Sequence, residues 1–124
     1  MNLDEIAYLM NRLRVTAVPD EYTLQREIQS LLDQNGIRYK KECPLAPRNR
    51  VDFLTEDGIA IEVKCGRQKP NLTRVLAQLQ RYAESEQVDA LLLLVERNLV
   101  GVPKQIAGKP CKVLGLHQLW GLAI

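Results

Sequence analysis

The sequence predicts an α/β domain in which a mixed β-sheet is flanked by helices. Three features indicate this class: segments with apolar residues at helical spacing, a continuous apolar run at Ala90–Val95, and a turn-forming segment between two apolar stretches. The continuous run is expected for a strand that is covered on both faces. A chain of 124 residues with a formal net charge of +2 fits a single domain, 1–124, and this charge alone identifies no partner.

Two amphipathic helices are predicted in the first third of the chain. Apolar residues recur at helical spacing within Leu3–Leu13, and this helix must end before Val18-Pro19, because the residue preceding a proline avoids the helical conformation. A second helix is predicted at about 20–34, with Asp20 as its N-cap and Gly36 after its end. The apolar stripe of this second helix consists of Leu24, Ile28, Leu31 and Leu32.

Three strands are predicted after these helices. The first covers Ile37–Glu42, after which Pro44 interrupts the chain. The next two, at about 51–55 and 59–64, form a β-hairpin, because Asp57-Gly58 between them has turn chemistry.

The second half of the chain completes the α/β pattern. A third helix is predicted at about 71–85, followed by the buried strand already described and an edge strand at Lys112–Leu116. A last short turn is expected at His117–Trp120. The apolar face of the third helix consists of Leu72, Val75, Leu76, Leu79 and Tyr82.

The hairpin has one polar face. Side chains alternate along a strand, so Ile61 and Val63 point to one face while Glu62 and Lys64 point to the other, where Asp52 can join them. Two carboxylates held close together repel unless a cation lies between them, and oxygen ligands suit Mg²⁺ or Mn²⁺. The alternative is an ordinary solvated face. The apolar character of the second hairpin strand favours a central position in the sheet, where charged residues rarely lack a role.

Asp52 followed by Glu62-Val63-Lys64 resembles the core motif of the PD-(D/E)XK nuclease superfamily, which includes restriction endonucleases, Holliday-junction resolvases and RecB-type nuclease domains. The resemblance covers about Asp20 to Glu96, and it departs from the superfamily pattern in having Val51, not proline, before the aspartate. It implies a restriction-endonuclease-like α-β-β-β-α-β core, to which the first helix of this chain is an addition.

The resemblance also implies roles for individual residues. Asp52, Glu62, the carbonyl of Val63 and Glu27 of the second helix would hold Mg²⁺ or Mn²⁺. Lys64 would hold or deprotonate the attacking water, or stabilise the phosphate. For Glu27 the alternative is a surface position at the edge of the apolar stripe.

Further residues are candidates for supporting the site or for binding nucleic acid. Gln78 and Tyr82 resemble the Gln-x-x-x-Tyr element of RecB-like members, and the alternative is a core tyrosine with a polar neighbour. Basic residues before and after the hairpin would offset the repulsion between the carboxylates and a phosphate backbone, unless they are ordinary solvated side chains. The basic candidates are Arg48, Arg50, Arg67 and Lys69.

The function expected from these features is that of a metal-dependent endonuclease acting on DNA, and a homodimer is compatible with so short a chain. The alternative is a nuclease-like module that binds DNA or protein without cutting. So short a chain has little room for a separate recognition domain, which favours recognition of DNA structure or ends. Structure-specific cleavage, as by a junction resolvase, sequence-specific cleavage and exonuclease activity all stay open. Three cysteines without paired metal spacing predict reduced thiols in a cytoplasmic protein, and no apolar run approaches the ~20 residues of a membrane span.

Overall fold

The structure is a computed structural model that describes residues 1–13, 20–65, 70–96 and 99–115. Within these residues the chain forms three helices and one six-stranded mixed sheet, so the predicted α/β class is confirmed. The helices are α1 (Leu3–Met10), α2 (Glu21–Gln34) and α3 (Leu72–Ala83). The strands are β1 (Tyr39–Ala46), β2 (Asn49–Thr55), β3 (Ile59–Lys64), β4 (Ala90–Val95), β5 (Gln105–Ile106) and β6 (Lys109–Gly115).

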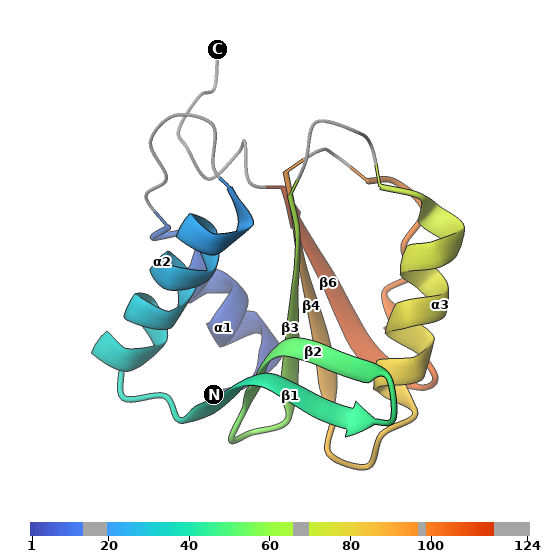
Figure 1. The fold of residues 1–124 in the computed structure, drawn as a ribbon, viewed down its shortest axis with the longest axis horizontal. Helices are drawn as coiled ribbons and strands as arrows, with labels where there is room; N and C mark the ends of the chain where they lie inside the picture. The colour runs from blue at the N-terminus through green and yellow to red at the C-terminus, as the bar shows by residue number, and fades with distance from the viewer. Residues whose placement is uncertain (14–19, 66–69, 97–98, 116–124) are drawn as a thin grey trace.

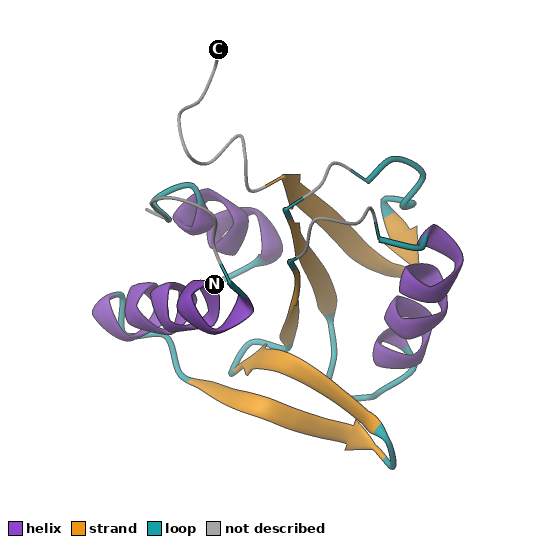
Figure 2. Ribbon diagram, turned by 45° about the horizontal axis from the view of Figure 1, so that its top comes forward, coloured by secondary structure: helices purple, strands orange, loops and turns teal. Residues whose placement is uncertain are grey.

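The helices cover opposite faces of the sheet, with α1 and α2 on one side and α3 on the other (Figure 1, Figure 2). The strand order is β1-β2-β3-β4-β6-β5. The first three strands pair antiparallel, whereas β3, β4 and β6 are parallel neighbours. Parallel neighbours need a crossover connection, and α3 lies between β3 and β4 in the sequence.

The core consists of two apolar layers separated by the sheet. Strand β4 is buried along its whole length, as its continuous apolar sequence predicts. Leu92 and Leu94 belong to the layer beneath α1 and α2, while Leu91 and Leu93 belong to the layer beneath α3. No helix within the described ranges is long and apolar enough to cross a membrane.

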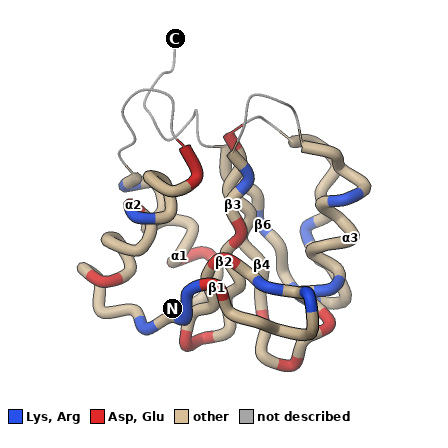
Figure 3. Tube along the Cα trace, in the orientation of Figure 1, with Lys and Arg blue, Asp and Glu red and all other residues tan. Residues whose placement is uncertain are grey.

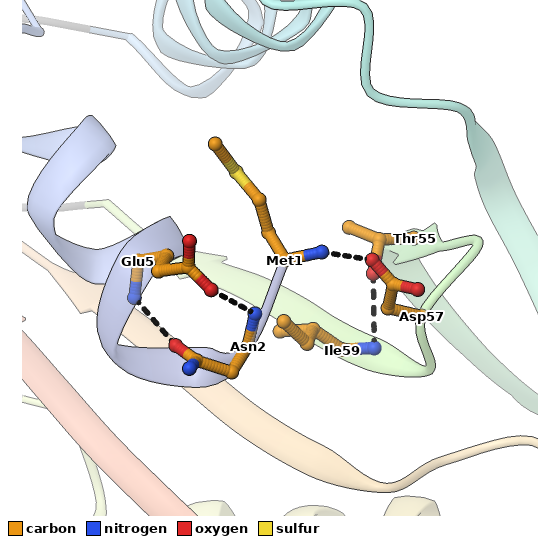
Figure 4. Close-up of polar contacts among 6 residues, drawn as sticks. All are labelled: Met1, Asn2, Glu5, Thr55, Asp57 and Ile59. Carbon is orange, nitrogen blue, oxygen red and sulfur yellow. Dashed lines mark hydrogen bonds and ion pairs between the residues drawn. The ribbon is translucent and has the colours of Figure 1, made fainter.

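Side-chain caps fix where the helices begin. Asp20 accepts a hydrogen bond from the N–H of Thr23 (2.6 Å) and is the N-cap of α2, as predicted. Helix α1 has a capping box that the sequence analysis did not identify, in which Asn2 and Glu5 each accept a hydrogen bond from the other's backbone N–H (Figure 4). This helix ends at Met10, earlier than predicted.

The turn between β2 and β3 is held by side chains as well as by backbone. The N–H of Ile59 donates to the Thr55 hydroxyl (3.0 Å), and the amino group of Met1 pairs with the Asp57 carboxylate (Figure 4). Gly58 has a φ of +82°, a conformation that side-chain-bearing residues rarely adopt. Its carbonyl accepts a hydrogen bond from the N–H of Asp89 (2.7 Å), which ties the turn to the start of β4.

Replacing Gly58 by alanine is therefore expected to destabilise the protein. A Cβ at this position would lie 2.5 Å from Oδ2 of Asp89, in addition to the strain of a positive φ. Gly36 has a φ of +67° with nothing within 4 Å of the added Cβ, so Gly36→Ala is a matched control for backbone strain alone. In urea unfolding, Gly58→Ala should lose about 1 kcal/mol more than Gly36→Ala. Equal losses would show that Asp89 does not limit this position.

The first strand is longer and later than predicted. Strand β1 begins at Tyr39 and continues through Pro44 to Ala46, so the predicted interruption at Pro44 is wrong. The reason is that β1 lies at the edge of the sheet, where a missing N–H is tolerated. The register shifts between Pro44 and Ala46.

The last described strand also differs in detail. Strand β6 begins at Lys109, and the short β5 pairs with its first two residues, so only its later part is a sheet edge. Leu116 and the predicted turn at His117–Trp120 lie outside the described residues.

Candidate active site

Strands β2 and β3 separate at Asp52, and two carboxylates bridge the gap. Backbone register between the strands ends at the pair Phe53 and Ile61. Beyond it, the N–H of Asp52 donates to Oε1 of Glu62 (3.2 Å), and the N–H of Val63 donates to Oδ2 of Asp52 (2.8 Å). Each carboxylate therefore accepts a backbone hydrogen bond from the opposite strand, so both are held in a fixed position.

The alternation predicted for β3 is confirmed. Ile61 and Val63 pack in the layer beneath α1 and α2, while Ala60, two residues before Glu62, packs in the layer beneath α3. Nζ of Lys64 lies 3.3 Å from Oε2 of Glu62. The structure thus brings together three of the predicted site residues, one on β2 and two at the end of β3.

The two carboxyl groups are poorly hydrated. Glu62 is only 6% exposed, and its burial, together with the charge of Asp52, raises its pKa to about 7. Burial also raises the pKa of Asp52, although the hydrogen bond from the N–H of Val63 offsets part of this rise. Negative charge is therefore unfavourable in this pair unless a cation accompanies it, and Lys64 compensates only partly.

Tyr82 connects α3 to this site. Its side chain is fully buried, its hydroxyl donates to the carbonyl of Arg50 (2.7 Å), and the same hydroxyl accepts from Nε2 of Gln78 (2.8 Å). Burial and the charge of Glu62 raise the pKa of Tyr82. Tyr82 is thus a core residue, as the alternative interpretation held, and its polar end contacts the strand that bears Asp52.

Removing the Tyr82 hydroxyl should weaken the link between α3 and β2. Tyr82→Phe leaves the carbonyl of Arg50 without its donor, which is expected to lower the free energy of unfolding by about 1–3 kcal/mol. Tyr39→Phe is a matched control, because the Tyr39 hydroxyl bonds the exposed Asp33 (2.9 Å). Chemical denaturation should give a smaller loss for this control. Equal losses would contradict a structural role for the Tyr82 hydroxyl.

The structure does not gather Glu27 with Asp52 and Glu62. No three His, Cys, Asp or Glu side chains in the described part of the chain are arranged to hold a metal ion. The acid of α2 that is close to the pair is Glu21, because the charges of Asp52 and Lys64 both act on its carboxyl.

The direction of α2 explains this difference. The helix begins beside the end of β3 where Lys64 lies and runs away from it, so its first turn is nearest the site (Figure 1). Glu21 is seven residues before the buried Ile28 and shares its face of the helix, whereas Glu27 is rotated by about 100° from Ile28. Glu21 is exposed, but desolvation by its neighbours and the charge of Asp52 raise its pKa.

A second acid that the sequence analysis missed is Glu42 on β1. The flanking pairs of the register place it opposite Asp52, and its charge contributes to the raised pKa of that residue. Its φ is +50°, a strained conformation for a residue with a side chain. The sequence holds no signal for this position, because the register of β1 depends on the turn that follows.

Two of the four basic candidates are described, at the start of β2 and in the turn before it. Arg50 is an exposed residue of β2, and Arg48 is exposed in the turn before it, with a φ of +62°. Arg67 and Lys69 lie outside the described residues.

The cysteines are free thiols, as predicted. Cys65 follows Lys64 directly and packs against the layer beneath α1 and α2, where burial raises its pKa to about 12. A thiol with this pKa is a poor nucleophile and a poor metal ligand at neutral pH. The reactive groups at the end of β3 are therefore the carboxylates and the amine.

Comparisons of the chain with protein-family models, with curated proteins and with solved structures found no match. The assignment of a function therefore depends on the chemistry of Asp52, Glu62 and Lys64 themselves.

Proposed function

We propose that this protein is a metal-dependent deoxyribonuclease of the PD-(D/E)XK type, which hydrolyses phosphodiester bonds of DNA. One observation carries the proposal. Asp52 and Glu62 are buried or half-buried carboxylates, each fixed by a backbone hydrogen bond from the opposite strand, with Lys64 3.3 Å from Glu62. A solvated strand face would have neither the burial nor these bonds.

The order of elements supports the finer fold assignment within this proposal. Helix α2, strands β1 to β3, helix α3 and strand β4 follow one another as α-β-β-β-α-β. The motif residues lie on the second and third strands of that series. In this assignment α1, β5 and β6 are additions to the core.

The donor set fits a hard divalent cation. Asp52 and Glu62 offer carboxylate oxygens, the ligands that Mg²⁺ and Mn²⁺ prefer, and the raised pKa values of both groups are what a bound cation would reverse. The bound ion would supply Lewis-acid polarisation of the phosphate and a water of lowered pKa. Glu21, on whose carboxyl the charge of Asp52 acts, could add a ligand after a side-chain movement, and the carbonyl of Val63 is the further ligand that the resemblance implies.

The residues of the chain have separate tasks in this mechanism. The backbone bonds of Asp52 and Glu62 fix the positions of their oxygens before substrate arrives, so little reorganisation is needed during the reaction. Lys64 is 31% exposed and can reach a phosphate from its place beside Glu62. It would stabilise the negative charge that develops on the phosphate, or donate to the attacking water.

A panel of DNA substrates tests this proposal. Supercoiled, linear, flapped and four-way DNA would be incubated with Mg²⁺ or Mn²⁺, and with a chelator as the blank. The wild-type protein should cut at least one substrate, and Asp52→Asn should cut none. Asp4→Asn is a matched control, because Asp4 is an exposed acid on α1 and pairs with Lys112.

The outcome also separates catalysis from simple binding. Cleavage by wild type and Asp4→Asn alone would support the nuclease. If the wild-type protein binds DNA but cuts no member of the panel with either ion, the proposal fails and a nuclease-like binding module is the better description. Cleavage by Asp52→Asn at the wild-type rate would also contradict the proposal.

A further inference from the structure

A groove of about 820 Å³ runs along α3 beside the proposed catalytic residues, and we infer that it binds the phosphates of one DNA strand next to the bond that is cut. That the ligand is DNA rests on the function proposed above, whereas the position of the bound strand along α3 does not. This α3 groove is lined by Lys64, Pro70, Asn71, Arg74, Val75, Ala77, Gln78 and Arg81.

The charge of the groove favours a polyanion. Three of its lining side chains are cationic, namely Lys64, Arg74 and Arg81, and no acidic side chain is among the described lining residues. The formal net charge of the whole chain is only +2, so a lining with three cationic and no described acidic side chains is more positive than the chain as a whole. The Lys and Arg positions of α3 are coloured blue along the trace in Figure 3. Arginine suits phosphate particularly well, because its planar group donates two parallel hydrogen bonds.

The spacing of the polar residues makes a continuous track. Arg74, Gln78 and Arg81 are four and three residues apart on α3, so they lie on one side of the helix and cover about 10 Å of its length. Asn71 caps the start of the same helix by accepting from the N–H of Arg74 (3.1 Å). The positive end of the helix dipole adds to the attraction for phosphate at that end.

The groove is continuous with the proposed catalytic site. Lys64 belongs to both, since it lines the groove and lies 3.3 Å from Glu62. At the level of Gln78 a second connection exists, because Gln78 donates to the Tyr82 hydroxyl and that hydroxyl donates to the carbonyl of Arg50. A strand lying along Arg74 and Arg81 would therefore reach Lys64 of the proposed site.

The size and the lining of the groove favour one strand over a duplex. Its volume is in the range of sites that take a ligand of drug size, which matches a few nucleotides of a single strand. The apolar lining residues are Pro70, Val75 and Ala77, and no described lining residue is aromatic. Contacts therefore go to phosphates more than to stacked bases, which predicts little dependence on sequence.

The test is the binding of a fluorescent oligo-dT of about 20 nucleotides in Ca²⁺, measured by anisotropy between about 50 and 200 mM salt. Arg74→Ala and Arg81→Ala should each weaken binding about tenfold. Each should also make the slope of log K against log salt shallower by about 0.7. Arg74→Lys should restore the slope, because it keeps the phosphate contact. Arg12→Ala is the matched control, an exposed arginine next to Asp4 and Glu5 in another pocket.

Three results would overturn the inference. One is unchanged affinity and slope in the double variant Arg74→Ala/Arg81→Ala, the second is an equal loss in Arg12→Ala, and the third is equally tight binding of a closed duplex without ends. Failure of the groove and failure of the nuclease are distinguishable. If the groove variants bind the oligonucleotide as tightly as wild type while Asp52→Asn abolishes cleavage, only the assignment of the groove is contradicted. If the groove variants bind the oligonucleotide weakly but the wild-type protein cuts no DNA, only the proposed nuclease activity is contradicted.

Discussion

Replacing Lys64 by alanine is expected to lower the rate of Mg²⁺-dependent DNA cleavage by at least 10²- to 10³-fold, the effect of removing one preorganised donor at a developing negative charge. The amine lies beside Glu62, where negative charge of the phosphate would develop in the reaction. Most DNA binding in Ca²⁺ should remain, because Arg74 and Arg81 of the α3 groove are unchanged. Single-turnover cleavage and anisotropy on the same preparations measure the two effects.

Lys112→Ala is the matched control for this experiment. Its amine pairs with Asp4 of α1 (2.7 Å), away from the α3 groove, so cleavage should be unaffected. A Lys64→Ala protein that cuts as fast as wild type would remove Lys64 from the mechanism, even if Asp52 and Glu62 keep their roles. A loss of binding as large as the loss of cleavage would instead make Lys64 a binding residue.

The second large effect is on stability and its pH dependence. Burial raises the pKa of Glu62 from an ordinary 4.5 to about 7, so folding favours the protonated form of this carboxyl. The contribution of this raised pKa to the free energy of unfolding is complete below pH 4.5 and is lost as the pH rises through about 7. Asp52 shifts in the same direction. The wild-type protein should therefore lose about 3 kcal/mol between acidic and alkaline pH from Glu62 alone.

Glu62→Gln removes this ionisation while keeping the shape of the side chain. In the presence of a chelator, the variant should be more stable than wild type at pH 8, and its unfolding free energy should vary less between pH 5 and pH 8. Glu56→Gln, an exposed residue of the turn after β2, should leave the wild-type profile unchanged. A wild-type stability that rises over this pH range, or a Glu62→Gln protein that is less stable at pH 8, would contradict the pKa assignment.

Local patterns predicted much of the fold and the centre of the candidate site. The period-two alternation of β3 placed Glu62 and Lys64 opposite Ile61 and Val63, and the helical spacing of α3 placed Gln78 beside Tyr82. These predictions succeed because alternation is a property of one strand or one helix, independent of the rest of the chain. The turn at Gly58 then brings Asp52 to Glu62 across the hairpin.

Features that depend on how elements pack were not predictable in the same way. The choice between Glu21 and Glu27 depends on which end of α2 lies beside β3, which the sequence of α2 does not contain. The position of Glu42 opposite Asp52 depends on the register of β1 with β2. The predicted end of β1 was wrong, because the prediction assumed that Pro44 interrupts the strand. A proline is tolerated in a strand at the edge of a sheet, and the position of β1 at the edge is a property of the whole sheet.

The α3 groove falls between these two cases. The spacing of Arg74, Gln78 and Arg81 can be read from the sequence, and it predicts a polar face on the helix. Only in the folded structure does that face of α3 lie beside Lys64 and line a groove with it. A basic stripe on a helix is otherwise indistinguishable from an ordinary solvated surface.

Calorimetric titration of the protein with Mn²⁺ tests most directly whether Asp52 and Glu62 form a metal site. The wild-type protein and the Asp4→Asn control should bind the ion and release protons at pH 7, because Glu62 is partly protonated before binding. Asp52→Asn and Glu62→Gln should lose that binding. Equal Mn²⁺ binding by wild type and both variants, with the same heat and the same proton release, would contradict the site.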